Sequence, residues 1–228
     1  MPQSISRNPI KNQVLTRLAR TDFALLKPHL EAVDLPVPMQ LETANARIEA
    51  VYFLESGFAS VVADGPGKRS IEVGIIGREG MTGLSVVLGH DRSPHETYIQ
   101  AMGSAHRLSA AKLRAAMEQS APLHRSLLRS VHAFLLQATQ TAVANGRSKN
   151  QERLARWLLM AADRMDGKEL PLTHRFLALM LGVQRPAVTV VVQALERKGL
   201  IKAGREVITI TDRKGLVEMS NGSYLPPT

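Results

Sequence analysis

The sequence contains no cysteine among its 228 residues. This absence excludes disulfide bonds, zinc sites with thiolate ligands, cysteine-held iron–sulfur clusters and cysteine nucleophiles. No apolar run approaches the roughly 18 residues that a transmembrane helix needs. Residues 1–10 are polar with scattered proline, unlike a secretory signal peptide. We therefore expect a cytoplasmic protein without a membrane partner.

Sequence patterns that carry catalysis are missing as well. The chain has no HxH, HExxH, GxSxG or P-loop pattern, and no carboxylate pair at helical spacing that suggests acid–base chemistry. Glu55, Glu72 and Glu79 fit solvated positions in turns or at strand edges. The seven histidines are scattered singly, which is more typical of ordinary surface or core residues than of ligands. We expect neither an enzyme nor a metal or cofactor.

Positive charge is abundant, with a formal net charge of +9. Residues 147–228 hold 14 Lys and Arg against 8 Asp and Glu, so this last third carries a net +6 of that total. A basic excess favours a polyanionic partner such as nucleic acid or an anionic membrane surface. Taken alone, it is equally consistent with a role in solubility.

The first half of the chain begins with helical spacing and continues with short strands. Apolar residues from Leu15 to Leu30 predict one or two short amphipathic helices. Strands are then predicted at residues 48–54, 59–63, 70–76 and 96–101, with turns at 55–57, 64–68 and 77–83. Many short strands with Gly-rich turns indicate a small β-barrel or jelly roll.

A long helix is predicted after Pro122 and is expected to end at Gly146. Apolar residues recur along it in a heptad-like seam, formed by Leu128, Val131, Leu135, Ala138 and Ala142. The seam either packs on its own domain's core or forms a homodimer interface, and its length alone does not decide between the two. Residues 148–151 then have the Ser-x-x-Gln form of a capping box and predict the start of another helix.

The last third carries the clearest functional pattern. Thr173 is a plausible N-cap of a short helix, Gly182-Val183 makes a tight turn, and a second helix starts near Arg185 with Pro186 in its first turn. Residues 200–211 follow as a hairpin with its turn at Gly204-Arg205. Helix, turn, helix and hairpin form the outline of a winged helix-turn-helix. A buried strand over residues 188–192 is the alternative, because of its valines, but the flanking residues favour a helix.

In such a module the N-terminal end of the second helix reads base edges in the major groove. Gln184 and Arg185 stand there, and Arg is suited to guanine O6 and N7. Further contacts to DNA are expected along the second helix, at the start of the first helix, where N–H groups favour phosphate, and at the hairpin tip. These additional candidates are Thr189, Gln193, Thr173, His174, Arg175 and Arg205.

The order of these parts resembles the Crp/Fnr family of bacterial transcription regulators. The resemblance covers nearly the whole chain and is carried by residues 51–57, 72–83, 153–159, 177–182 and 194–201. It implies an α+β protein with a jelly-roll sensor domain in residues 1–120, a dimerisation helix in 121–146 and a winged helix-turn-helix in 147–228. It further implies a homodimer on a palindromic operator in double-stranded DNA, with RNA polymerase as a partner.

The sequence departs from the cyclic-AMP-binding members of that family. Their pocket Gly-Glu pair corresponds to Gly80-Met81, and their Arg-Ser pair corresponds to His95-Glu96. Methionine accepts no ribose hydrogen bond and Glu96 repels phosphate, so we expect no response to cyclic AMP. Arg92-Ser93 stands three residues before the expected position of the Arg-Ser pair, and a shifted pair leaves cyclic-AMP binding as an alternative. A pocket for another small-molecule effector is expected at Gly80, Met81, Thr82, Gly83, Leu84, Arg92, Ser93 and His95.

The second helix departs from the family pattern too. The family's Arg-Glu pair and later Arg correspond to Arg185-Pro186 and Val190, so Arg185 keeps its expected contact while the operator differs. The alternatives to a transcription regulator are an effector-binding module or a jelly-roll enzyme without a DNA-binding role. The missing catalytic patterns argue against the enzyme, and the basic last third and the placement of Gln184-Arg185 argue against the effector-binding module.

Overall fold

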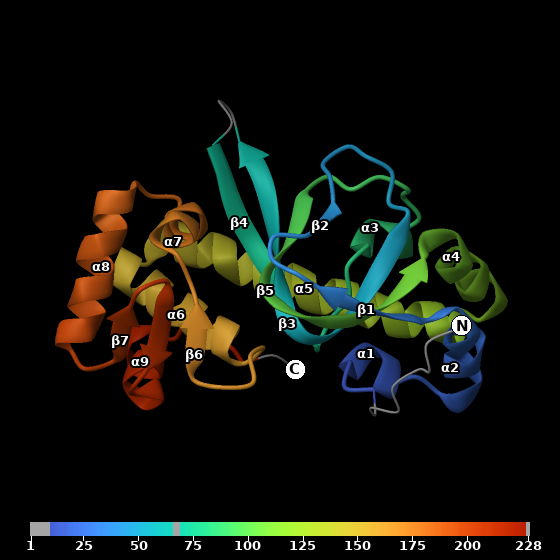
Figure 1. Cartoon of the computed structure of the whole chain (residues 1–228). Coiled ribbons are helices and arrows are strands. Elements are labelled where there is room, and N and C mark those ends of the chain that lie inside the picture. Colours follow the sequence, from blue (N-terminus) through green and yellow to red (C-terminus); the bar gives the residue numbers. More distant parts are fainter. Residues whose placement is uncertain (1–9, 66–68, 227–228) are drawn as a thin grey trace. The chain divides into compact units, whose positions relative to one another are not determined.

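The computed structural model describes residues 10–65 and 69–226 (Figure 1). Contacts divide the chain into two compact units, and each is built from two stretches of sequence. The first unit comprises Met1–Ala59 and Ile76–Phe134, and the second comprises Ser60–Ile75 and Leu135–Thr228. The boundaries at 120/121 and 146/147, drawn from the sequence, remain a prediction.

Short helices surround the β-structure of the first unit. They are α1 (Gln13–Thr16), α2 (Arg20–Leu26), the 3-10 helix η1 (Lys27–His29), α3 (Leu84–Val87) and α4 (Ala110–Gln119). Their inner faces pack with Phe53 and Met81 in a core whose members are almost completely buried. The side chain of Asn12 caps α1 and also donates to the carbonyls of Leu54 and Gly80, both at 2.9 Å. These bonds fasten the start of the described chain to the unit.

A five-stranded antiparallel sheet has the order β1-β5-β3-β4, with β2 also paired to β5. Its strands are β1 (Glu31–Leu35), β2 (Gln40–Glu42), β3 (Ala50–Gly65), β4 (Arg69–Ile76) and β5 (Glu96–Ser109). In the β1–β5 pair, Glu31 lies opposite Arg107 and their side chains form an ion pair of 2.9 Å. The predicted strands are present, whereas β1 and β2 had no clear sequence signal.

The turn predicted at residues 55–57 is wrong, because β3 runs without reversal through 16 residues. Gly57 has a φ of +70°, and a Cβ at this position would lie 2.4 Å from the carbonyl oxygen of Ala101. Glycine is therefore needed for the close approach of β5, not for a reversal. The next predicted turn, at 64–68, lies partly outside the described residues and joins β3 to β4.

Helix α5 (Ala121–Arg147) spans 27 residues and belongs to both units. Leu123, Leu127 and Ala144 lie on its buried face. Helix α6 (Asn150–Ala162) follows, but its cap lies one residue later than the Ser-x-x-Gln pattern predicts. The backbone N–H of Lys149 donates to the carboxylate of Glu152 at 3.0 Å. Glutamate accepts this bond as an anion at the positive end of the helix, which stabilises the start of α6.

The second unit also contains α7 (His174–Leu181), α8 (Arg185–Arg197) and α9 (Arg213–Met219). Its small sheet has the order β6-β8-β7, formed by β6 (Glu169–Pro171), β7 (Ile201–Gly204) and β8 (Val207–Ile210). The valines at 188, 191 and 192 are buried inside α8, so the alternative of a strand is wrong. In the described part of the chain, no single helix is long and apolar enough to cross a membrane; α7 and α8 together pass that test by length and composition only.

Candidate nucleic-acid interface

Helices α7 and α8 form the predicted helix-turn-helix. The hydroxyl of Thr173 accepts a hydrogen bond of 3.2 Å from the backbone N–H of Phe176 and so caps α7. Gly182 ends this helix with a φ of +63°, a conformation that glycine adopts at little cost. The two helices are bent by 99° relative to each other, within the range of this motif.

The two sides of α8 differ in character. Val188 and Leu195 are completely buried and fix the back of the helix on its domain. Gln184, Arg185 and Gln193 are exposed on the other side. Burial on one side fixes the helix, so the exposed polar side chains are presented on a rigid element. This is the arrangement that reading base edges requires.

Not every predicted contact residue is free for DNA. The Thr189 hydroxyl lies 3.4 Å from Nδ1 of His174 and 3.5 Å from the carbonyl oxygen of Arg185. Thr189 is half-buried, whereas His174 is exposed. These two residues therefore link α7 to α8, and Thr173 is engaged as a cap. Arg175 remains exposed at the start of α7.

The hairpin of β7 and β8 turns at Arg205-Glu206, one residue later than predicted. Glu206 has a φ of +58° and Arg205 is exposed at the tip. The hairpin is held to α8 by a hydrogen bond of 2.9 Å from the N–H of Ala203 to the carboxylate of Glu196. This bond links the hairpin to the C-terminal part of α8.

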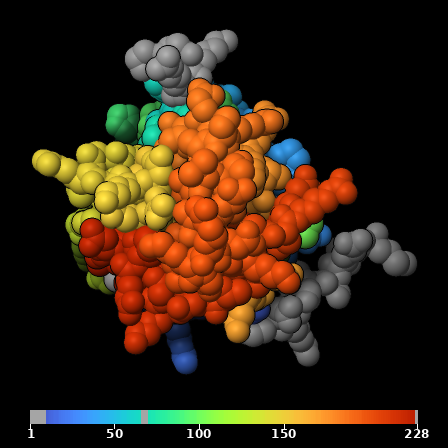
Figure 2. Space-filling view, turned by 90° about the vertical axis from the view of Figure 1, so that its left-hand side faces the viewer, coloured from blue at the N-terminus to red at the C-terminus, as the bar shows by residue number. Residues whose placement is uncertain are grey.

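Figure 2 shows this side of the second unit, where the orange surface of α7 and α8 adjoins the red surface of the following hairpin and α9. Exposed basic residues lie on all of these elements, and sequence reasoning singled out only some of them. Their charge is suited to a phosphate backbone. The exposed basic set is Arg175, Arg185, Arg197, Lys198, Lys202, Arg205, Arg213 and Lys214.

The predicted effector residues fall into two groups in the first unit. Met81 and Thr82 are completely buried, with Met81 in the apolar core and the Thr82 hydroxyl bonded to the N–H of Tyr52 at 3.0 Å. Gly83 packs against Val51, where a Cβ would lie 2.3 Å from a methyl group, and donates to Glu42 at 2.8 Å. These residues fill the structure rather than line a space. Gly80 and Leu84 are half-buried beside them.

The second group lies before β5. Arg92 is exposed and its guanidinium donates to the carbonyl oxygen of Asn45 at 2.7 Å. The hydroxyl of Ser93 donates to the carbonyl oxygen of His95 at 2.8 Å. Both side chains thus have partners in the protein, and Ser93 is buried. Arg92 does not take the place of a buried phosphate-binding arginine.

The sequence of the C-terminal part matches a known domain. Residues 152–219 match the family model of the Crp-like helix-turn-helix domain. No curated protein matches the chain. Residues 152–219, from α6 to α9, therefore form a Crp-like helix-turn-helix domain within the second unit.

Solved structures share the fold of nearly the whole chain. A Crp/Fnr-family regulator from Eubacterium rectale has a TM-score of 0.72 at 20% identity, covering 93% of this chain and 99% of its own. FixK2 from Bradyrhizobium japonicum has a TM-score of 0.71 at 17% identity, covering 83% and 96%. The chain thus shares the fold of Crp/Fnr-family regulators over most of its length, which confirms the predicted fold.

Proposed function

We propose that the chain binds double-stranded DNA sequence-specifically, with α8 as the recognition helix. The observation that supports this most strongly is the contrast between the two sides of α8. Gln184 and Arg185 are exposed at its N-terminal end, while Val188 and Leu195 hold its back in the core. Arg175 and Arg205, on neighbouring elements, supply phosphate contacts on either side of the reading helix.

We further propose a homodimer formed through α5. Leu135 is 59% exposed, and Leu128 and Ala142 are exposed on the same side, with Val131 and Ala138 half-buried between them. Large apolar side chains without cover favour an interface with a second copy of the chain. A two-fold dimer presents two copies of α8, so its operator is an inverted repeat.

Selection of bound sequences from random duplexes tests the function directly. We expect an inverted repeat whose half-sites are separated by one helical turn, about 10 base pairs, or a multiple of it. In the same assay Leu135→Asp, which places a charge in the interface, should abolish enrichment and halve the mass measured by sedimentation. Gln140→Asp, at a half-buried position away from the seam, is the matched control. Enrichment of an unsymmetrical single site, or an unchanged mass for Leu135→Asp, contradicts the dimer.

The first unit is proposed to be a sensor that responds to a small molecule other than cyclic AMP. The protein is proposed to act in the cytoplasm. RNA polymerase is the proposed partner of the DNA-bound dimer. One structural relative is described as a c-di-GMP-responsive regulator and another as a putative cAMP-binding protein. A thermal-shift screen should therefore include both nucleotides. Because Met81 is completely buried in the core, cyclic AMP at millimolar concentration should leave the melting temperature unchanged. A clear rise overturns this part of the proposal.

A further inference from the structure

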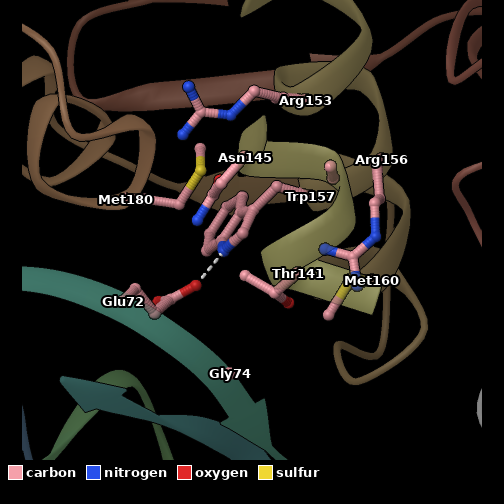
Figure 3. A pocket seen from close by; sticks show the side chains of 10 residues that line it. Glu72, Gly74, Thr141, Asn145, Arg153, Arg156, Trp157, Met160 and Met180 are labelled. Carbon is pink, nitrogen blue, oxygen red and sulfur yellow. Dashed lines mark hydrogen bonds between the residues drawn. The ribbon is translucent and has the colours of Figure 1, made fainter. Parts of the chain in front are cut away.

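A buried carboxylate lies in the second unit, at the contact of the β3–β4 hairpin with α6. Glu72 of β4 is only 4% exposed, so the expectation of a solvated position is wrong. Its two oxygens accept hydrogen bonds from the hydroxyl of Ser60 at 2.7 Å and from the indole N–H of Trp157 at 2.5 Å. Figure 3 shows the carboxylate pointing from the strand toward the indole. A small pocket lies beside this bond and is also lined by Arg153, Arg156 and Met180.

The same residues lead from the hairpin to the helix-turn-helix. The ring of Trp157 packs on Phe176 of α7, with a centroid distance of 5.2 Å and a tilt of 58°. Ile71, next to Glu72, lies against Gly182, where a Cβ would come within 3.2 Å of its terminal methyl. Arg153 donates to the carbonyl oxygen of Leu181 at 2.5 Å. The hairpin therefore contacts the turn between the two helices directly, through Ile71, and reaches α7 through Trp157 of α6.

We propose that Glu72 is a positioning residue for the DNA-binding surface, and that loss of its proton weakens the attachment of the hairpin to α6 and α7. Hydrogen bonding explains why the carboxyl of Glu72 can be either protonated or ionised at this position. Trp157 only donates, so one carboxyl oxygen always accepts from it. The Ser60 hydroxyl donates to an ionised carboxylate and accepts from a protonated one. The observed contacts are thus compatible with the neutral carboxyl as well as with the ionised one.

Burial raises the pKa of Glu72 from 4.5 to about 7, although bonds from Ser60 and Trp157 and the charges of Arg156 and Arg164 act in the opposite direction. These two guanidiniums are the charged groups that act on Glu72, while Arg153 lines the same pocket. An exposed Glu72 on a detached hairpin keeps the ordinary value. Attachment is therefore strongest below pH 4.5, and weakens by at most tenfold per unit as the pH rises to about 7.

Trp157 is the only tryptophan in the chain, so its fluorescence reports on this bond directly. We expect the emission of the full-length protein to titrate between pH 5 and 8.5 with a midpoint near 7. Glu72→Gln keeps an acceptor for Trp157 and gains a donor for Ser60, and should abolish the titration. Ser60→Ala removes a donor to the ionised form and should shift the midpoint upward. Asp64→Asn, an exposed carboxylate of the same hairpin, is the matched control and should titrate like the wild type.

The link to DNA rests on the proposed function, so it is measured separately on the selected duplex. Between pH 5.5 and 7.5 the wild type should lose affinity relative to Glu72→Gln, by up to about tenfold per pH unit. A flat emission profile in the wild type, or the same titration in Glu72→Gln, overturns the role of Glu72. Equal pH profiles for DNA binding in these two proteins overturn the coupling. Titrating fluorescence without DNA binding by any variant refutes the proposed function and the coupling to DNA, but supports the ionisable link itself.

Discussion

Substitution of Arg185 by alanine is the most direct test of base reading by α8. Arg185 is the first residue of the helix and is exposed, so its loss should change the free energy of unfolding by less than about 0.5 kcal/mol. A bidentate contact to guanine contributes roughly 1–3 kcal/mol of discrimination, which corresponds to roughly 5- to 150-fold in affinity. We expect fluorescence anisotropy to show this loss on the selected duplex. On a second duplex, which differs from the selected one only at the contacted base pair, the wild type and Arg185→Ala should bind with nearly equal affinity.

Arg175→Ala is the matched control, because Arg175 is equally exposed but stands at the start of α7. Its loss should weaken binding to the selected and the random duplex alike, and should lower the slope of affinity against salt concentration by about one. The loss of affinity caused by Arg185→Ala is expected to persist at high salt, where phosphate contacts are screened. If Arg185→Ala weakens both duplexes to the same extent, Arg185 contacts phosphate and the assignment of base reading is wrong.

Three further substitutions test the framework beneath the site. Leu195→Ala opens a cavity behind α8 and should lower the free energy of unfolding by about 2–5 kcal/mol, measured in urea. Gly57→Ala places a Cβ 2.4 Å from the Ala101 carbonyl oxygen at a residue with a φ of +70°. It should lower the free energy of unfolding by more than about 1–2 kcal/mol, and an unchanged melting temperature would contradict this strain. Asp163→Ala removes the 2.6 Å ion pair with Arg213, which joins α9 to the end of α6, and should cost about 1 kcal/mol, seen as faster hydrogen exchange in α9.

The helix-turn-helix was predictable because its signals are local. Thr173 caps α7 through a bond to a residue three positions later, and Gly182 ends it in the left-handed conformation. Pro186 fits the first turn of α8, and the apolar spacing of this helix matches the buried side that the structure contains. Each of these signals depends on neighbours within about four residues, which the sequence displays directly.

The failed predictions depend on partners far away in the sequence. Glu72 looks like a solvated residue at a strand edge, yet Trp157, 85 residues later, supplies one of its donors. Gly57 looks like a turn residue, yet its conformation serves a strand more than 40 residues away. Methionine at position 81 disfavours cyclic AMP by its chemistry, and only the packing places its side chain in the core. Long-range burial, unlike capping or turn formation, has no periodic signature in the chain.

In the proposed DNA complex, the outer face of α8 also limits how the operator can be read. Val190 is 60% exposed and Pro186 lies one turn before it, so two positions in the middle of this face offer only carbon atoms. Neither side chain discriminates by hydrogen bonding, and apolar groups in the major groove find their counterpart in the methyl group of thymine. Hydrogen-bonded reading by α8 then depends on Gln184, Arg185 and Gln193. Because so few side chains of α8 can hydrogen-bond to bases, affinity depends strongly on the position of this helix. A displacement of the helix removes a large share of the specific contacts.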